Sequence, residues 1–242
     1  DLSQVGVFLS LANNGFNCWV DGEVFIPEHW FSEAWTERRQ QVGLPAERTF
    51  QTKPELGWQM IQRAIAQELP FEAIAFDSLY GKNPWLRDQI AAAGREYYAD
   101  VPAQTTVYLS QPVIGWPQNK RGRKAKYQRV LSPRPYRVEA VARLADTTWQ
   151  TRPLRPDERG MLTADFAARR VWTVRADLTL VQEWLLIRRE GTKHSYTFSN
   201  APQETSGLTM AQRKSQRYFI ERSNQDAKSE FGWDEFQATK FL

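Results

Sequence analysis

The sequence predicts an α/β protein with a mostly β segment inserted near its middle. Three observations carry this prediction. Strand-like and helix-like segments alternate over residues 4–101, strand-like segments predominate over 102–206, and a helical pattern returns over 208–232. Because such alternation is typical of parallel strands joined by helices, we expect parallel pairing after residue 50.

The chain begins with a predicted hairpin. Residues 4–12 and 16–27 are rich in Val, Phe and Trp, and the NNG sequence at 13–15 is a turn signal between them. Asp21-Gly22 is a second turn signal. Residues 27–43 are expected to form a short helix and a loop.

Two helices and two strands follow the hairpin. Thr52 and Glu55 match a capping box at the start of the first helix, which is expected to end near Pro70. A strand over 71–76 then leads into Asp77. The second helix has Asn83 as its cap, with Pro84 at its first position and Gly94 just past its end, and a strand over 95–101 follows.

The remaining pattern predicts three segments: 1–101 as the first part of the core, 102–206 as a β-rich insertion with a basic segment, and 207–242 as the closing helix of the core. Within the insertion, 136–145, 169–178, 181–190 and 194–201 are strand-like. The closing helix is expected over 208–232, capped by Thr209 with Gln212 in a capping box and ended by Gly232.

Composition excludes several classes of protein. The 242 residues carry a net charge of +4, a mild basic bias that is compatible with nucleic acid. One cysteine, Cys18, allows no internal disulfide, and no stretch has the length of an apolar membrane span or the pattern of a signal peptide. These features predict a cytoplasmic protein without a membrane partner.

Nucleophilic, zinc and nucleotide-binding sites are disfavoured. The only histidines, His29 and His194, lie in no nucleophile context and have no metal-ligand spacing, so we interpret them as ordinary residues. No Walker A or dinucleotide motif is present.

Carboxylates are the remaining candidates for chemistry. Asp77 follows an apolar strand, as either a loop residue facing water or a metal ligand. Arg217, Glu221, Gln225 and Lys228 share one helix face by their spacing. That face is either a solvated salt-bridge face, or it turns Glu221 inward to share a hard cation with Asp77 while its basic residues meet phosphates.

A basic segment lies within the insertion. Residues 120–129 contain six basic residues, and 101–138 contain eight Lys or Arg and no acidic residue. The segment is either a solvated loop or a DNA phosphate-binding arm that is poorly ordered without DNA. The candidate contacts are Lys120, Arg121, Arg123, Lys124 and Lys126.

Several segments resemble, in the same order, the DDE-type transposases of bacterial insertion sequences, in the group with a β-rich insertion before the final Glu. They are VGVFLSLA…VDGEVFIPEHW, FQTKPEL, FDSLYGKNPWLR, WLLIRRE and RYFIERSNQDAKSEFGWDEFQ. The resemblance implies an RNase H-like core with a mixed sheet and flanking helices. It also implies metal-dependent cleavage and strand transfer at insertion-sequence ends.

The same resemblance implies roles for individual residues. Asp77 matches the second catalytic acid and metal ligand, and Glu221 the third. Arg217 and Lys228 match basic residues that hold DNA phosphate, whereas Lys214 stands where the family has Tyr. Two Mg²⁺ ions are expected, with Mn²⁺ as a substitute, and the partner is double-stranded DNA, with a homodimer on DNA.

The insertion is expected to cover the DNA end. Its aromatic residues Trp149, Trp172 and Trp184 are candidates for stacking on an unpaired base, with core packing as the alternative.

One expected acid has no match. The family's first Asp lies on a strand upstream of the opening hairpin, whereas Asp1 stands in the wrong context and Asp21 fits a structural turn. The resemblance thus predicts a core without its first strand and first acid, which binds DNA but does not cut it. The alternative function is a non-catalytic DNA-binding remnant or a domesticated transposase fragment.

Overall fold

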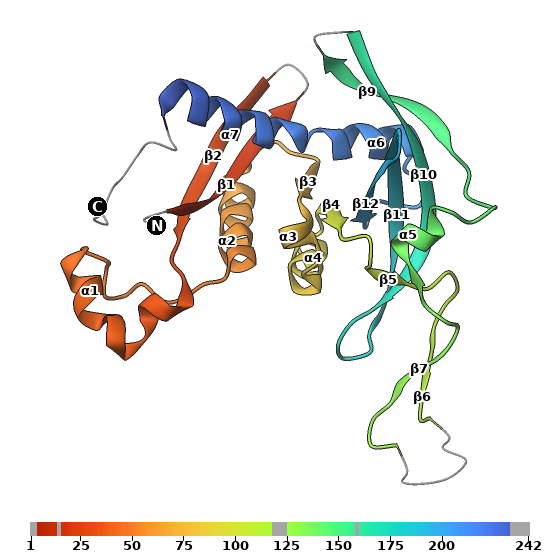
Figure 1. Cartoon of the computed structure of the whole chain (residues 1–242), viewed down its shortest axis with the longest axis horizontal. Coiled ribbons are helices and arrows are strands. Elements are labelled where there is room, and N and C mark those ends of the chain that lie inside the picture. Colours follow the sequence, from red (N-terminus) through yellow and green to blue (C-terminus); the bar gives the residue numbers. More distant parts are fainter. Residues whose placement is uncertain (1–3, 14–15, 118–124, 158–159, 233–242) are drawn as a thin grey trace. The chain divides into compact units, whose positions relative to one another are not determined.

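The computed structural model describes residues 4–13, 16–117, 125–157 and 160–232 (Figure 1). The chain forms two compact units. The first comprises residues 1–71 together with 216–242, and the second comprises residues 72–215. The division into 1–101, 102–206 and 207–242 concerns the family architecture and stays a prediction.

The first unit combines a hairpin with helices. Its elements are β1 (Val5–Asn13), β2 (Phe16–Phe25), the short 3-10 helices η1 (Glu28–Phe31) and η2 (Glu33–Trp35), α1 (Thr36–Gln41), α2 (Lys53–Ala66) and α7 (Tyr218–Phe231). Helix α2 begins at the predicted capping box, in which Thr52 accepts from the Glu55 amide and Glu55 accepts from the Thr52 amide. Helices α2 and α7 both pack on the hairpin.

The turn predicted at Asp21-Gly22 is wrong. Both residues pair within β2, opposite Leu9 and Phe8, and a bulge follows at Leu9/Ser10. Gly22 lies against the Phe8 ring, since a Cβ there would come 3.0 Å from the Phe8 Cδ1 atom. The glycine therefore makes room for a cross-strand ring and does not reverse the chain.

The second unit is built on a six-stranded mixed sheet in the order β3-β4-β12-β11-β10-β9. Strands β3 and β4 are parallel, as predicted, and the other neighbours are antiparallel. The sheet elements are β3 (Ala73–Phe76), β4 (Glu96–Val101), β9 (Gln150–Asp157), β10 (Gly160–Val174), β11 (Leu180–Glu190) and β12 (Lys193–Ser199).

Helices and small strand pairs complete the second unit. They are α3 (Ser78–Gly81), α4 (Pro84–Ala92), α5 (Val138–Val141), α6 (Gly207–Ser215), β5 (Thr106–Val107) with β8 (Tyr136–Arg137), and β6 (Val113–Gly115) with β7 (Arg129–Ser132). The sequence did not predict α3, β9 or the strands β5, β6 and β7. Pro153 and Pro156 argue against a strand in the sequence, but β9 lies at a sheet edge, where proline is tolerated.

Strand β4 of this sheet is covered on both of its faces. Consecutive residues Tyr97 and Tyr98 point to opposite sides, as strand geometry requires. Tyr98 packs with Leu186 and with Met210 of α6, whereas the Tyr97 hydroxyl meets the polar residues beneath α4. Both faces of β4 are therefore buried, and the mixed α/β prediction is confirmed.

Two predicted elements differ in the structure. Residues 136–145, expected as a strand, form β8 and then the short helix α5, because Val138 and Val141 are both fully buried at helical spacing. The closing helix predicted over 208–232 is two helices, α6 and α7. Its cap is Ser206 instead of Thr209, since the Thr209 amide donates to Ser206 Oγ at 3.0 Å. Gly232 ends α7 as predicted, with φ of 62°.

Candidate active site

Asp77 lies at the carboxyl end of β3 and caps the short helix α3. Its Oδ1 accepts hydrogen bonds from the Leu79 amide at 2.8 Å and the Tyr80 amide at 3.4 Å. Across the described part of the chain, no hydrogen bond or ion pair engages Oδ2. The carboxylate is thus held by one oxygen while the other is free to bind a ligand.

Helix α3 is fixed from two sides. A Cβ on Gly81 would lie 1.9 Å from the carbonyl oxygen of Asp100, so only glycine allows α3 this close to β4. From the other side, Arg87 Nη1 donates to the Gly81 carbonyl at 2.5 Å. Burial, together with the charge of Asp77, raises the pKa of Tyr80 to about 12. The backbone that positions Asp77 is therefore tightly constrained.

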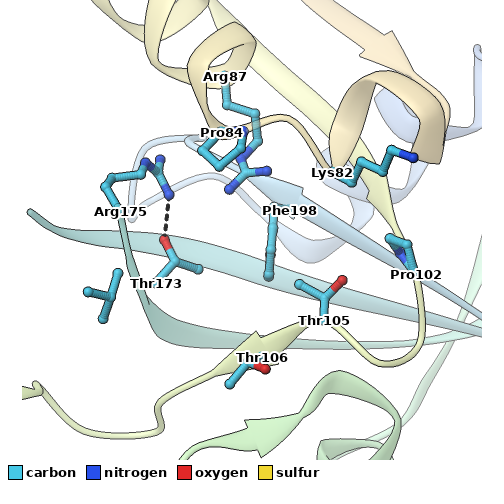
Figure 2. A pocket seen from close by; sticks show the side chains of 10 residues that line it. Lys82, Pro84, Arg87, Pro102, Thr105, Thr106, Thr173, Arg175 and Phe198 are labelled. Atoms are coloured by element: carbon cyan, nitrogen blue, oxygen red, sulfur yellow. Dashed lines mark hydrogen bonds between the residues drawn. The ribbon is translucent and has the colours of Figure 1, made fainter. Parts of the chain in front are cut away.

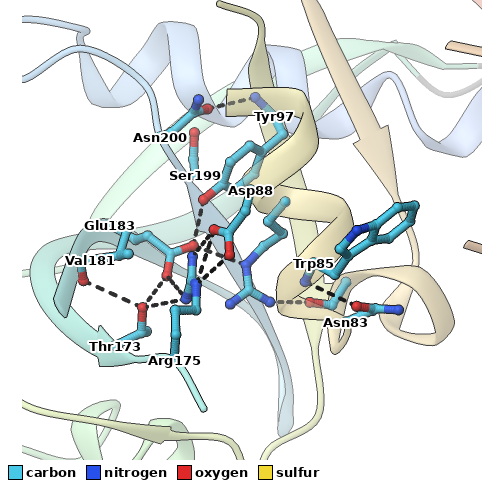
Figure 3. A network of polar contacts seen from close by, with 12 residues as sticks. Asn83, Trp85, Asp88, Tyr97, Thr173, Arg175, Val181, Glu183, Ser199 and Asn200 are labelled. Carbon is cyan, nitrogen blue, oxygen red and sulfur yellow. Dashed lines mark hydrogen bonds and ion pairs between the residues drawn. The ribbon is translucent and has the colours of Figure 1, made fainter. Parts of the chain in front are cut away.

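A buried polar network lies behind this helix (Figure 3). Glu183 of β11 is fully buried and accepts from Arg87 Nε at 3.0 Å, the Tyr97 hydroxyl at 2.5 Å and the Thr173 hydroxyl at 2.5 Å. Arg175 reaches Glu183 at 3.4 Å. Burial opposes ionisation of Glu183, but the charges of both arginines and these hydrogen bonds lower its pKa overall.

Sequence reasoning missed this network. Its signal is present in VQEWLLI, where one carboxylate interrupts an apolar strand. A buried carboxylate requires a cationic partner, but spacing alone does not identify Arg87, 96 residues away. The network supports α4 and, through Arg87, the helix that Asp77 caps.

A small pocket of about 180 Å³ opens beside the network (Figure 2). Lys82, Arg87 and Arg175 contribute positive charge to its lining, and Phe198 contributes an aromatic ring. Two of these charges are already compensated, since Arg87 pairs with Glu183 and Arg175 with Asp88. The pocket therefore gives no independent evidence of an active site.

Glu221 lies in the first turn of α7, in the first unit. Its side chain is 57% exposed and accepts from Arg217 Nη1 at 2.5 Å. Lys228 is exposed in the last turn of the same helix. The helix face predicted from spacing is thus an i,i+4 ion pair followed by a basic residue.

The convergence of Asp77 and Glu221 stays a prediction, because one lies in the second unit and the other in the first. Across the described residues, no group of three or more His, Cys, Asp or Glu side chains could hold a metal ion. Taken singly, the free Asp77 oxygen and the exposed Glu221 carboxylate are the oxygen ligands that Mg²⁺ prefers.

Lys214 has a structural partner. It is buried on α6, and its Nζ lies 3.3 Å from the carboxylate of Asp100, which also accepts from the Thr197 hydroxyl at 2.5 Å. Asp100 follows Ala99, which pairs with Phe76, so it stands beside the strand end that carries Asp77. The ion pair of Lys214 with Asp100 therefore joins α6 to the end of β4, and the sequence did not predict this contact.

Asp21 also has a structural environment. It receives Arg63 Nε at 2.7 Å, an ion pair that joins α2 to β2. Asp1 lies outside the described residues. The two histidines contact aromatic rings, His29 against Trp35 and His194 against Tyr196.

The predicted basic contacts are only partly described. Lys120, Arg121, Arg123 and Lys124 lie outside the described residues. Lys126 is exposed, with Nζ 5.5 Å from the centre of the Tyr127 ring. Their role in binding DNA stays a prediction.

The three tryptophans proposed for stacking are half-buried within the second unit. Arg189 lies over Trp149 and Arg170 over Trp184, and Trp184 packs against the core. Trp172 forms an isolated β-bridge with Tyr108. These contacts agree with the core-packing alternative, and stacking on a base remains untested.

Among the described helices, none has the length and apolar character needed to cross a membrane. In comparisons with known proteins, the family model described as DDE superfamily endonuclease matches residues 1–160. No curated protein and no solved structure matches the chain.

Proposed function

This chain belongs to the DDE superfamily of endonucleases, and we propose that it is the catalytic domain of an insertion-sequence transposase. The activity proposed is metal-dependent cleavage and strand transfer at the ends of the element. The observation that carries the proposal is Asp77, which a strand end presents with one oxygen held and the other free. The mixed sheet with flanking helices is consistent with an RNase H-like DDE fold.

In this proposal Asp77 and Glu221 are the metal ligands. Enzymes of this superfamily use divalent ions, and two Mg²⁺ ions, or Mn²⁺ in their place, would supply an activated water and a stabilised leaving oxygen when bound. The two carboxylates contribute acceptor oxygens and no general base, which agrees with a site without histidine. Hydrogen bonds from the Leu79 and Tyr80 amides hold the Asp77 carboxylate in one orientation.

The partner proposed is double-stranded DNA, at the element's ends and at its target, with the protein acting as a homodimer on DNA in the bacterial cytoplasm. Arg217 caps the helix that carries Glu221, Lys228 lies in its last turn, and both would contact phosphate. Residues 102–206 act as the β-rich insertion, and the basic residues of 120–129 add phosphate contacts.

Nicking of supercoiled plasmid in Mg²⁺ or Mn²⁺ tests the assignment, in a version extended upstream to supply the first acid, because the resemblance predicts that the 242 residues alone bind DNA without cutting it. Asp77→Asn keeps a good helix cap but removes the charge, so α3 should stay intact. We expect nicking to fall about 10³-fold, because metal ions contribute several kcal/mol of transition-state stabilisation. Glu221→Gln should behave alike, whereas Glu230→Gln, exposed on the same helix, is the matched control.

Nicking that survives Asp77→Asn would refute the assignment. An extended protein that binds DNA but nicks it in neither metal would instead support the alternative, a non-catalytic DNA-binding remnant or domesticated fragment. A single assay with a parallel binding measurement therefore separates the two functions.

A further inference from the structure

Two large aromatic side chains are exposed on one small hairpin of the second unit. Trp116, directly after β6, is 57% exposed, and Tyr127, two residues before β7, is 70% exposed. We call residues 113–117 and 125–132 the β6–β7 arm. In Figure 1 the arm extends away from the six-stranded sheet. Val113 and Leu131 of the same hairpin are exposed as well, and exposed apolar side chains that gather among polar residues mark an interaction surface.

The arm has a defined local structure. Ile114 pairs with Val130 and Gly115 with Arg129, and a bulge lies between Val113 and Ile114. A Cβ on Gly115 would come 2.8 Å from the Leu131 Cδ1 atom, so the glycine admits the Leu131 side chain across the hairpin. Leu131 is itself half-exposed. The apolar surface is therefore part of a folded hairpin.

The charged residues of the arm and of the chain segment that contains it have one sign. Lys126, Arg129 and Arg134 are exposed on or beside the arm, and residues 101–138 contain no acidic residue. Lys126 Nζ lies 5.5 Å from the Tyr127 ring centre. A second copy of the arm would be repelled, whereas a polyanion with flat apolar groups would be complementary.

We propose that the β6–β7 arm binds DNA by stacking Trp116 and Tyr127 on bases while Lys126 and Arg129 contact phosphates. This inference deepens the proposed function and rests on it. Phosphate binding alone would require the cations but not the rings. Aromatic side chains stack on any base, and apolar side chains wedge between base steps, so the arm would bind with little dependence on sequence.

The salt dependence of DNA affinity distinguishes the contribution of the aromatic rings from that of the charged residues. Affinity for a mixed-sequence duplex is measured at several salt concentrations for wild type, Trp116→Ala and Tyr127→Ala. We expect each ring variant to lose about tenfold or more in affinity with an unchanged slope of log affinity against log salt. The double variant Lys126→Ala/Arg129→Ala should reduce that slope by about two counterions.

Phe16→Ala is the matched control, because Phe16 is 58% exposed in the first unit. Circular dichroism verifies that each variant is folded, and 2-aminopurine in the duplex reports unstacking that the ring variants should abolish. Unchanged affinity in both ring variants would overturn the proposal. A changed slope of log affinity against log salt in either ring variant would overturn it as well. A change in oligomeric state without loss of DNA affinity would assign the arm to contact between copies and would also overturn it.

The outcome is distinct from that of the proposed function. If nicking depends on Asp77 and Glu221 but the ring variants bind normally, the nuclease stands and the arm proposal fails. If the wild-type chain binds no DNA, both fail.

Discussion

Glu183 is a fully buried carboxylate in the middle of an apolar strand. Arg87, also buried, and Arg175 surround it, and the Tyr97 and Thr173 hydroxyls donate to its oxygens. Removing one member of a buried ion pair leaves the other charge without compensation. The second unit therefore depends on this carboxylate more than on any exposed ion pair.

Glu183→Gln should destabilise the protein. Glutamine keeps the shape but leaves Arg87 and Arg175 without their shared negative charge, and we expect a loss of about 3 kcal/mol in the free energy of unfolding. Urea unfolding followed by circular dichroism measures it. Glu190→Gln on the same strand is the control, because the Glu190 side chain is 51% exposed and its pair with Arg188 should contribute about 0.5 kcal/mol or less.

The same residue sets a pH dependence. The pKa of Glu183 is lower in the folded protein than its ordinary value of 4.5, so the unfolded chain binds its proton more readily. Its stabilisation is complete above that ordinary value and is lost as the pH falls through the lowered pKa. Stability measured at falling pH should therefore decline less steeply in Glu183→Gln than in wild type, and identical slopes would contradict this account.

At the scale of elements, local signals gave correct predictions. The capping box at Thr52 and the Asn83 cap mark α2 and α4, and the left-handed Gly232 ends α7. Each signal depends on neighbours within four residues, which the sequence displays directly. The position of Asp77 at a strand end could be predicted for the same reason.

Errors arose where distant packing decides. The Val and Ala residues of 136–145 fit a strand, but Val138 and Val141, three residues apart, are both buried within the second unit, and this burial selects a helix. The buried pair of Lys214 with Asp100, 114 residues apart, and the network around Glu183 have no local signature. The sequence thus predicted the candidate acids, but not the side chains that support them.

Gly81→Ala should damage the site without touching its acids. The new Cβ would meet the Asp100 carbonyl, a backbone atom that cannot move aside, so α3 must shift. We expect a loss of about 1–3 kcal/mol in stability and a marked fall in nicking, although Asp77 is retained. Gly207→Ala is the control, since its Cβ would meet only the tip of Arg152 at 3.5 Å. Equal behaviour of the two variants would argue against a role for this close contact.

At the scale of the whole molecule, the candidate acids belong to different compact units. A common metal site would require their carboxyl groups to lie about 4–8 Å apart, given ligand distances near 2 Å and two ions. Because the chain has a single cysteine, Cys18, thiol chemistry can measure this distance with little background.

In a Cys18→Ser background, Asp77→Cys/Glu221→Cys should be joined within one chain by a short bis-maleimide. Asp77→Cys/Glu230→Cys is the matched control, because nine further residues of helix displace its thiol by about 13 Å. Mass spectrometry of the monomer band reports the product. Equal yields from both pairs, or none from the first, would remove the basis for a shared metal.

The capped carboxylate at the end of β3 also bears on ion selectivity. With Oδ1 committed to two backbone amides, Asp77 can offer a cation one oxygen and not a chelating pair. Larger Ca²⁺ fills its seven or so positions with the help of bidentate carboxylates, whereas Mg²⁺ accepts single oxygens in an octahedron completed by water and phosphate. The two hydrogen bonds to Asp77 Oδ1 that begin α3 would thus favour binding of Mg²⁺ over the larger Ca²⁺.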